Sequence, residues 1–207
     1  MLKVLGKSTS INVRKVLWTC SELALNYELE EWGNQNGELL KAEFLALNPN
    51  ALVPVITDED FVLWESNSIC RYLASSMERW DLLPRSPKPK AHVEQWMDWQ
   101  ATELNNSWRY AFMALVRKNP SYSEDPAIDT SVRNWNQNMM LLERQLERSG
   151  DFILGSEFSL ADIGIGLSTH RWLSTPMERP ELPTVQAYYQ RLSQRKGFVE
   201  HGCNGVP

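Results

Sequence analysis

The sequence has few cysteines and histidines, and neither residue type forms a recognisable binding pattern. Only three of the 207 residues are cysteine, Cys20, Cys70 and Cys203, and no Cys-x-x-Cys pair occurs. An odd number of widely spaced cysteines favours a reducing compartment over secretion. The three histidines are also far apart and form no metal-ligand pattern. We therefore expect a cytoplasmic protein that binds no metal.

Long apolar runs and a strong excess of charge are missing as well. No stretch approaches the roughly 20 apolar residues of a membrane span, and the apolar start at residues 1–6 is too short for a signal peptide. The 21 basic and 26 acidic residues give a net charge of −5, which is the wrong sign for binding nucleic acid. Partners of both kinds, membrane and nucleic acid, are therefore not expected.

Short apolar runs alternate with helical patterns in the first part of the chain. Apolar alternation and helical spacing predict strands at residues 3–5, 27–31, 53–56 and 61–64, and helices at residues 13–24, 41–45 and 65–76. The acidic turn at residues 58–60 joins the last two strands into a hairpin. The predicted order is βαβαββα, in an α/β domain of residues 1–79.

The second part of the chain shows helical spacing only. Pro84, Pro87 and Pro89 predict a linker over residues 80–90. Beyond it, apolar residues recur at helical spacing from residue 90 towards 118, over 128–146 and over 185–192. Ser159 and Asp162 form a Ser-x-x-Asp signature that opens a further helix. Residues 91–207 are therefore predicted to form an all-helical domain.

Four segments resemble the serine-type cytosolic glutathione transferases, of the phi- and theta-like bacterial branch. They are the turn GKSTSINVRKVL at residues 6–17, the segment FLALNPNALVPV at 44–55, the segment LWESNSI at 63–69 and the box SLADI at 159–163. The resemblance spans nearly the whole chain and implies a thioredoxin-like domain followed by a helical domain. Ala51 departs from it, because many relatives have glycine there, which matters if the position needs a positive φ.

The resemblance implies a set of residues that hold glutathione as co-substrate. Ser66 would bind the γ-glutamyl carboxylate at a helix N-terminus, and Glu65 would bind the ammonium beside it. Val53, before a cis Pro54, would pair with the cysteinyl backbone. Lys41 would reach the glycine carboxylate. Judged from the residues alone, Glu65 and Ser66 could simply cap a helix, and a lone surface lysine is usually solvated.

The thiol of glutathione needs a group that stabilises its thiolate, because its ordinary pKa is about 8.5. Ser10 aligns with the catalytic serine of these transferases and precedes a helix, so its hydroxyl could donate to the thiolate. Ser8, Thr9 and Asn12 lie in the same turn and are alternatives, and Ser10 could also act as a helix cap only. The turn contains no cysteine, which argues against transferases that form a mixed disulfide with glutathione.

Nine tryptophans are many for a chain of this length, and Trp96, Trp99 and Trp108 fall on one predicted helix. Aromatic residues on a long helix pack in the core by default. In the resembling transferases this helix borders the electrophile pocket. We expect Asn105, Trp108 and Arg109 to border it here, with Arg109 stabilising an anionic leaving group or an acidic substrate.

The resemblance implies a glutathione transferase that works in detoxification as a homodimer. Its thiolate would attack a small electrophile, by conjugation, dehalogenation or peroxide reduction. Two alternatives stay open, namely a non-catalytic binding or stress protein with the same fold and a glutathione-dependent disulfide reductase. Val53-Pro54, Glu65-Ser66 and the hydroxyl-rich turn together favour the enzyme, because a scaffold has no physical need for all three.

Overall fold

A four-stranded mixed sheet lies at the centre of the N-terminal part. The computed structural model describes residues 1–33, 35–205 and 207. Its strands β1 (Lys3–Leu5), β2 (Glu28–Glu30), β3 (Val55–Asp58) and β4 (Phe61–Trp64) are arranged in the order β2-β1-β3-β4. β1 runs parallel to β2 and antiparallel to β3, and β3 and β4 form the predicted hairpin.

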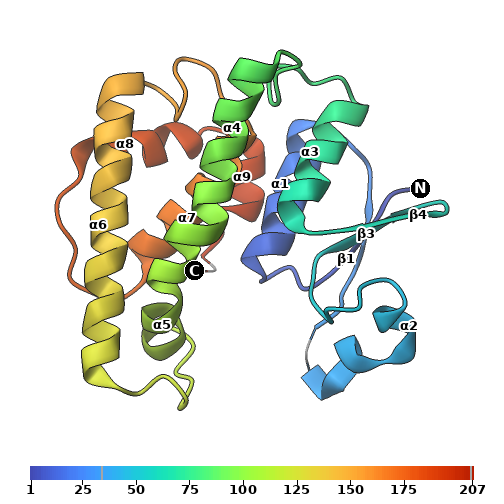
Figure 1. Ribbon diagram of the computed structural model, residues 1–207, viewed down its shortest axis with the longest axis horizontal. Helices are drawn as coiled ribbons and strands as arrows, with labels where there is room; N and C mark the ends of the chain where they lie inside the picture. Colours follow the sequence, from blue (N-terminus) through green and yellow to red (C-terminus); the bar gives the residue numbers. More distant parts are fainter. Residues whose placement is uncertain (34, 206) are drawn as a thin grey trace.

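Each face of the sheet has its own set of packed side chains. Successive side chains of a strand point to opposite sides, so neighbouring residues contribute to different faces. On one face, Val4 and Ile56 pack with α1 (Ile11–Glu22) and α3 (Ser66–Ser76). On the other face, Leu5 and Val55 pack with Leu39 and Phe44. These last two residues belong to a 3₁₀ turn (Gln35–Leu40) and to α2 (Ala42–Leu45), which lies beside the sheet opposite α1 (Figure 1).

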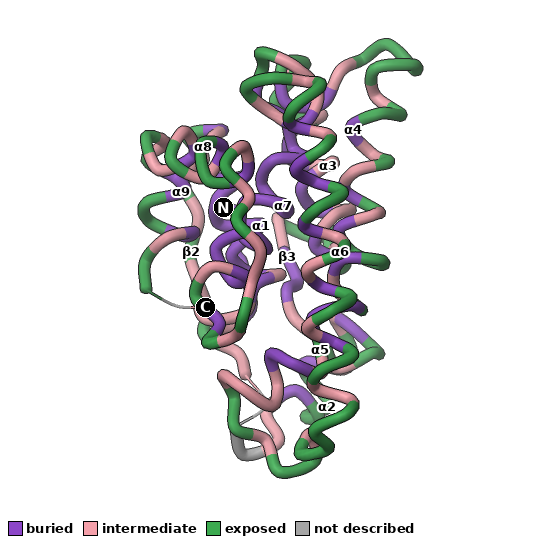
Figure 2. Tube along the Cα trace, turned by 90° about the vertical axis from the view of Figure 1, so that its left-hand side faces the viewer, coloured by how far each residue is buried: buried purple, intermediate pink, exposed green. Residues whose placement is uncertain are grey.

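The C-terminal part consists of helices, as predicted. They are α4 (Pro87–Trp99), a π-helical turn (Gln100–Leu104), α5 (Asn105–Leu115), α6 (Asp125–Ser149), α7 (Leu160–Ser174), α8 (Pro183–Leu192) and α9 (Lys196–His201). α7 is buried from Leu160 to Trp172, as expected of a helix with apolar residues on every side. Figure 2 shows α7 and α1 in the interior and green exposed positions along α6. Within the described residues no helix is long and apolar enough to cross a membrane.

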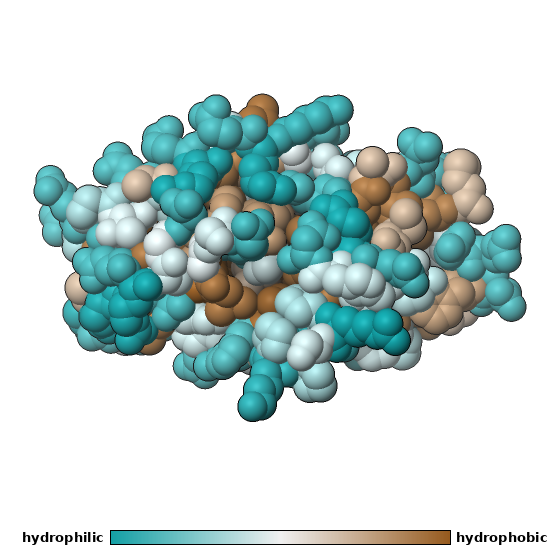
Figure 3. Space-filling model, turned by 90° about the horizontal axis from the view of Figure 1, so that it is seen from above, coloured by the Kyte–Doolittle hydropathy of each residue, from teal (hydrophilic) through white to brown (hydrophobic). Residues whose placement is uncertain are grey.

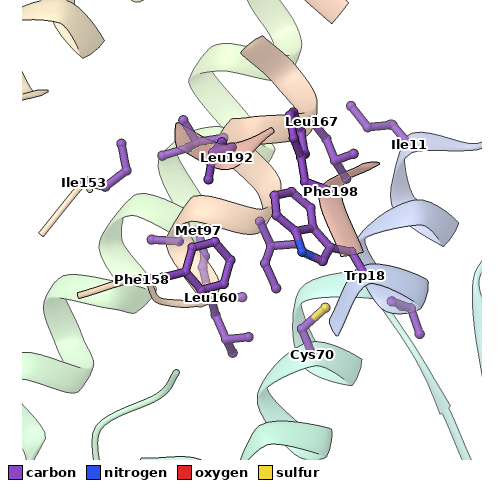
Figure 4. Packing of buried hydrophobic residues seen from close by; sticks show 14 of the residues in the cluster. Ile11, Trp18, Cys70, Met97, Ile153, Phe158, Leu160, Leu167, Leu192 and Phe198 are labelled. Atoms are coloured by element: carbon purple, nitrogen blue, oxygen red, sulfur yellow. The ribbon is translucent and has the colours of Figure 1, made fainter. Parts of the chain in front are cut away.

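The two parts share one core, in which α1 is the common element. Trp18 of α1 is fully buried, with its ring centre 4.9 Å from that of Phe198 in α9 and 5.8 Å from that of Phe158. Figure 4 shows Trp18 projecting among apolar side chains of the helical part. Gly197 and Gly166 leave no room for a Cβ atom beside this indole. The sheet and the helices are therefore packed as a unit.

The predicted element order is confirmed, whereas two predicted bounds are wrong. The strand expected at residues 53–56 is β3 (Val55–Asp58), and the linker ends before residue 90. α4 begins at Pro87 and includes Pro89. Prolines are tolerated there because the N–H groups of a first helical turn have no partner within the helix. The helix expected from residue 90 towards 118 is divided by the π-helical turn and ends at Leu115. The 3₁₀ turn and α9 were not predicted, because they are too short to show a helical period.

The start of α7 is organised by the buried carboxylate of Asp162. One oxygen accepts hydrogen bonds from the backbone N–H (2.9 Å) and the hydroxyl (3.0 Å) of Ser159. The other accepts from the backbone N–H of Ile153 at 3.0 Å and from the Tyr188 hydroxyl at 3.1 Å. The predicted capping box is thus confirmed, and it also ties α7 to the preceding loop and to α8.

Substituting Asp162 by alanine should destabilise the protein severely. The change leaves the N–H of Ile153 and the hydroxyl of Tyr188 buried without this acceptor, so the free energy of unfolding should fall by about 3 kcal/mol or more. Urea unfolding measures the change. Asp129→Ala, at an exposed position of α6, is the control and should stay within about 0.5 kcal/mol of wild type. A loss below about 1 kcal/mol for Asp162→Ala would contradict this account.

Candidate functional site

The turn between β1 and α1 presents the Ser10 hydroxyl at a helix N-terminus. Ser10 has extended backbone angles, its N–H donates to the Lys7 carbonyl at 2.8 Å, and its carbonyl accepts from the Arg14 N–H at 2.9 Å. The Ser10 side chain makes no capping hydrogen bond within the described part of the chain. Its half-buried hydroxyl is therefore available to another partner.

Of the other polar residues in this turn, only Thr9 shares the surroundings of Ser10. Thr9 is half-buried and borders the same cavity as Ser10. Asn12 lies on another side of the turn, where its amide oxygen accepts a long hydrogen bond of 3.4 Å from the Ser66 hydroxyl. Ser8 is exposed, and its backbone N–H donates to the Glu31 carboxylate at 3.3 Å.

A cavity of about 550 Å³ separates the Ser10 turn from α5 and α7. Its wall combines apolar and basic side chains with the hydroxyls of Thr9 and Ser10, and the lining residues are Lys7, Thr9, Ser10, Ile11, Gly33, Leu39, Val53, Trp108, Arg109, Phe112, Met113, Arg117 and Arg171. Trp108 and Arg109, which were predicted to border the electrophile, line this cavity. Trp96 and Trp99 do not line the cavity; they pack against each other at 5.0 Å and against the core.

A second cavity, of about 50 Å³, lies on the other side of Val53. Its lining residues are Asn12, Asn48, Leu52, Val53, Pro54, Glu65 and Ser66. Val53 therefore borders both cavities, and the bond between Val53 and Pro54 is cis. A small polar recess and a larger apolar and basic space thus adjoin at Val53.

Glu65 and Ser66 come together at this recess because α3 begins there. Ser66 is the first residue of α3 and is 7% exposed, so its hydroxyl lies beside the free N–H groups of the first helical turn. Glu65 has a φ of 72° and an exposed side chain. Such left-handed backbone is uncommon for a residue with a Cβ atom and clusters at binding sites. The recess can therefore accept a carboxylate beside an ammonium group.

Asn105 and Lys41 lie outside both cavities, and Ala51 has an unusual backbone conformation. Asn105 does not border the large cavity, because it lies one helical turn before Arg109, where its amide oxygen accepts from Gln100 Nε2 at 2.9 Å. Lys41 is exposed at the N-cap of α2 and lines neither cavity. Ala51 has a φ of 53°, so the backbone position that the resemblance associates with glycine does need a positive φ here.

Three basic residues of the large cavity were not predicted from the sequence. Lys7 belongs to the turn that was singled out, whereas Arg117 and Arg171 lie about 55 residues apart and meet only in the folded chain. Arg171 is 3% exposed, and burial lowers its pKa to about 9. Helical periodicity could not have predicted that Arg171 of α7 lines the large cavity, because α7 is buried on every side.

The chain resembles known proteins over its whole length. Residues 9–76 match the N-terminal domain family of glutathione S-transferases. The chain is 38% identical to the glutathione S-transferase GstB of Escherichia coli, with 94% of each chain covered, and 30% identical to glutathione S-transferase 3 of Zea mays, with 95% and 91% covered. A solved theta class glutathione S-transferase from Xanthomonas axonopodis pv. citri, with glutathione bound, superposes with a TM-score of 0.92 at 32% identity, covering 100% of this chain and 99% of that one.

A buried amine lies behind the small recess. Lys15 of α1 is 2% exposed, and its Nζ donates to the Asn67 side-chain oxygen at 3.3 Å. Burial lowers the pKa of Lys15 to about 8, although the nearby Cys70 thiol and the Glu65 carboxylate act in the opposite direction. A charged amine here therefore costs stability, because no carboxylate forms an ion pair with it among the described residues.

Replacing Lys15 by methionine, which has a similar volume, should stabilise the protein in a pH-dependent way. The pKa of Lys15 is about 8 in the folded chain, against an ordinary value of 10.5. Wild type therefore recovers stability as the pH rises from 8 to 10.5. Lys15→Met should therefore be more stable by about 1–3 kcal/mol at pH 7. This advantage should shrink by about 1–2 kcal/mol at pH 9.5.

Urea unfolding of both proteins at pH 7 and pH 9.5 provides the measurement. The comparison isolates Lys15, since every other titrating group is common to the two chains. An advantage that does not change with pH would show that the Lys15 charge is not the source of the cost.

Proposed function

The chain belongs to the glutathione S-transferase family and is a glutathione transferase, and we propose that Ser10 stabilises the thiolate of glutathione for attack on a small electrophile in the large cavity. The observation that carries this proposal is the free Ser10 hydroxyl at the start of α1, on the wall of a cavity that adjoins the Glu65–Ser66 recess. One molecule could thus be held by the recess and present a sulfur atom to Ser10.

The two ends of glutathione fit different parts of this arrangement. The γ-glutamyl carboxylate would lie on the Ser66 hydroxyl and the N-terminal N–H groups of α3, with its ammonium beside Glu65. The cysteinyl backbone would pair with Val53. Lys41 remains our candidate for the glycine carboxylate. In support, the similar Xanthomonas transferase was solved with glutathione bound.

Ser10 would act as a hydrogen-bond donor rather than as a base. The thiol proton leaves to solvent, and the Ser10 hydroxyl together with the N-terminus of α1 stabilises the remaining negative sulfur. The thiolate forms a bond to an electrophilic carbon, and the leaving group departs with its electron pair. Each unit by which the site lowers the thiol pKa requires about 1.4 kcal/mol of preference for the thiolate. Dehalogenation and peroxide reduction use the same nucleophile and stay within the proposal.

The disulfide reductase alternative has less support in the structure. Cys20 and Cys70 are buried in the core, and burial raises the pKa of the Cys20 thiol to about 12. Cys203 is half-buried near the end of the chain and lines neither of the two cavities. Any such reaction would have to rely on two glutathione molecules without an enzyme thiol.

We also propose that the protein is a homodimer, cytoplasmic and active in detoxification. The edge strand β4 exposes Phe61, Val62 and Trp64, and Met77 and Trp80 are exposed after α3. Figure 3 shows apolar side chains at the end of the molecule that holds the sheet. An edge strand with an apolar surface favours association with another chain. A second copy would cover this surface.

The Ser10 proposal predicts a shifted pKa for the bound thiol. Titrating the thiolate absorbance of glutathione bound to wild type should give a pKa one or more units below the ordinary value of about 8.5. Ser10→Ala should raise the pKa of the bound thiol most of the way back to its ordinary value, and should lower kcat/KM for conjugation at pH 6.5 by about 10²–10³-fold. Ser8→Ala is the control, because Ser8 is exposed and lines neither cavity, and it should behave like wild type. An unshifted thiol in wild type refutes the activation; an unchanged shift in Ser10→Ala assigns the role to Thr9 or Asn12.

The dimer proposal predicts that a charge on β4 yields monomers. Trp64→Glu places a carboxylate on the proposed interface and should halve the mass found by sedimentation equilibrium at micromolar concentration. Val199→Glu introduces the same charge at an exposed apolar residue of α9 and should leave the mass unchanged. A wild-type protein that sediments as a monomer would contradict the proposal.

A further inference from the structure

The charged residues that line the large cavity all have the same sign. They are Lys7, Arg109, Arg117 and Arg171, and no aspartate or glutamate is among the lining residues. The chain as a whole has 26 acidic and 21 basic residues, so this wall opposes the overall balance of charge. A cavity that concentrates one sign of charge attracts ligands of the opposite sign.

Four arginines outside the cavity have an acidic partner, which the cavity cations lack among the described residues. Arg71, Arg79, Arg191 and Arg195 each form an ion pair with a carboxylate. None of the four cavity cations pairs with an aspartate or glutamate side chain among the residues that the structure describes. Arg109 and Arg117 are exposed, on α5 and just beyond its end. Their charge is therefore not neutralised by a neighbouring side chain.

Arg171 is the most constrained of the four. Its guanidinium lies 4.5 Å from the ring centre of Trp108 and 4.0 Å from that of Phe112. One terminal nitrogen donates to a backbone oxygen of Pro207 at 3.3 Å. Nε of Arg171 and Nε1 of Trp108 are buried without a hydrogen-bond partner in the described structure. A buried cation and unused donors are costly unless an anion satisfies them.

The rest of the wall suits a carbon skeleton. Ile11, Leu39 and Phe112 are buried apolar residues of the wall, and Met113 is half-buried. Ser10 lies on the opposite wall of the cavity from α5. A ligand with an apolar body and one anionic group could thus point its charge at the arginines and its reactive carbon at the glutathione sulfur.

We propose that the electrophile of this transferase carries a carboxylate, which Arg109, Arg117 and Arg171 bind while the reactive carbon faces Ser10. The inference rests on the proposed function and names the substrate class of the same site. In a substitution of this kind the thiolate forms the sulfur–carbon bond, the carbon–halogen bond breaks, and halide leaves with the electron pair. The carboxylate takes no part in the bond changes; it orients the molecule, since guanidinium groups bind carboxylates through paired hydrogen bonds.

A matched pair of electrophiles tests the proposal. 4-Chloro-3,5-dinitrobenzoate and the corresponding benzamide react with thiolate at the same ring carbon and differ in charge. We expect wild type to show at least a tenfold higher kcat/KM for the benzoate, after each rate is divided by the uncatalysed rate with glutathione. Arg109→Gln and Arg117→Gln should each lower kcat/KM for the benzoate about 10-fold or more and alter that for the benzamide less than threefold.

A control variant and two distinguishable failures make the outcome decisive. Arg133→Gln removes the same charge from an exposed position of α6 outside the cavity and should change neither rate. Equal use of benzoate and benzamide by wild type, or equal losses for both in the Arg109 and Arg117 variants, overturns the carboxylate inference and leaves the transferase function intact. Failure of the transferase function itself would appear differently, as no turnover of either compound and an unshifted thiol pKa.

Discussion

The packing of α1 against both parts of the chain is the interaction on which the site depends. One end of α1 carries Ser10, and its middle is fixed to the helical part by Trp18 and by Arg14, which donates to the His201 and Gly202 carbonyls. Because interiors are densely packed, this contact holds the Ser10 turn at a set distance from α5 and α7. The cavity between them is thus a consequence of the shared core.

Electrostatics divides this site into two regions with different tasks. The small recess combines Glu65 with the N-terminus of α3 and so suits a group that carries both charges. The charged residues that line the large cavity are all basic. Val53 lies between the two regions, and Lys15 adds a poorly solvated positive charge behind the first. A thiolate at Ser10 would therefore lie in a field that favours negative charge from several directions.

The sequence predicted what depends on local chemistry and missed what depends on three-dimensional approach. The strands, the helix order and the Ser159–Asp162 box follow from alternation, period and capping, and the structure has them all. Of the three residues predicted to border the electrophile, Trp108 and Arg109 line the large cavity and Asn105 does not. Arg171 could not be predicted to line the cavity. Its helix, α7, is buried on every side, so the sequence pattern does not show which of its residues face the cavity. The start of α4 at Pro87 was not predicted, because prolines are common both in linkers and in the first turn of a helix.

The central claim is that one molecule spans the recess and the cavity with its sulfur at Ser10. A crystal structure with S-(4-carboxy-2,6-dinitrophenyl)glutathione, the conjugate of the benzoate, tests it most directly. The account predicts the γ-glutamyl carboxylate on Ser66, the sulfur within about 3.5 Å of the Ser10 hydroxyl, and the aryl carboxylate in contact with Arg109, Arg117 or Arg171. A conjugate whose sulfur lies away from Ser10, or whose carboxylate points to solvent, would contradict it.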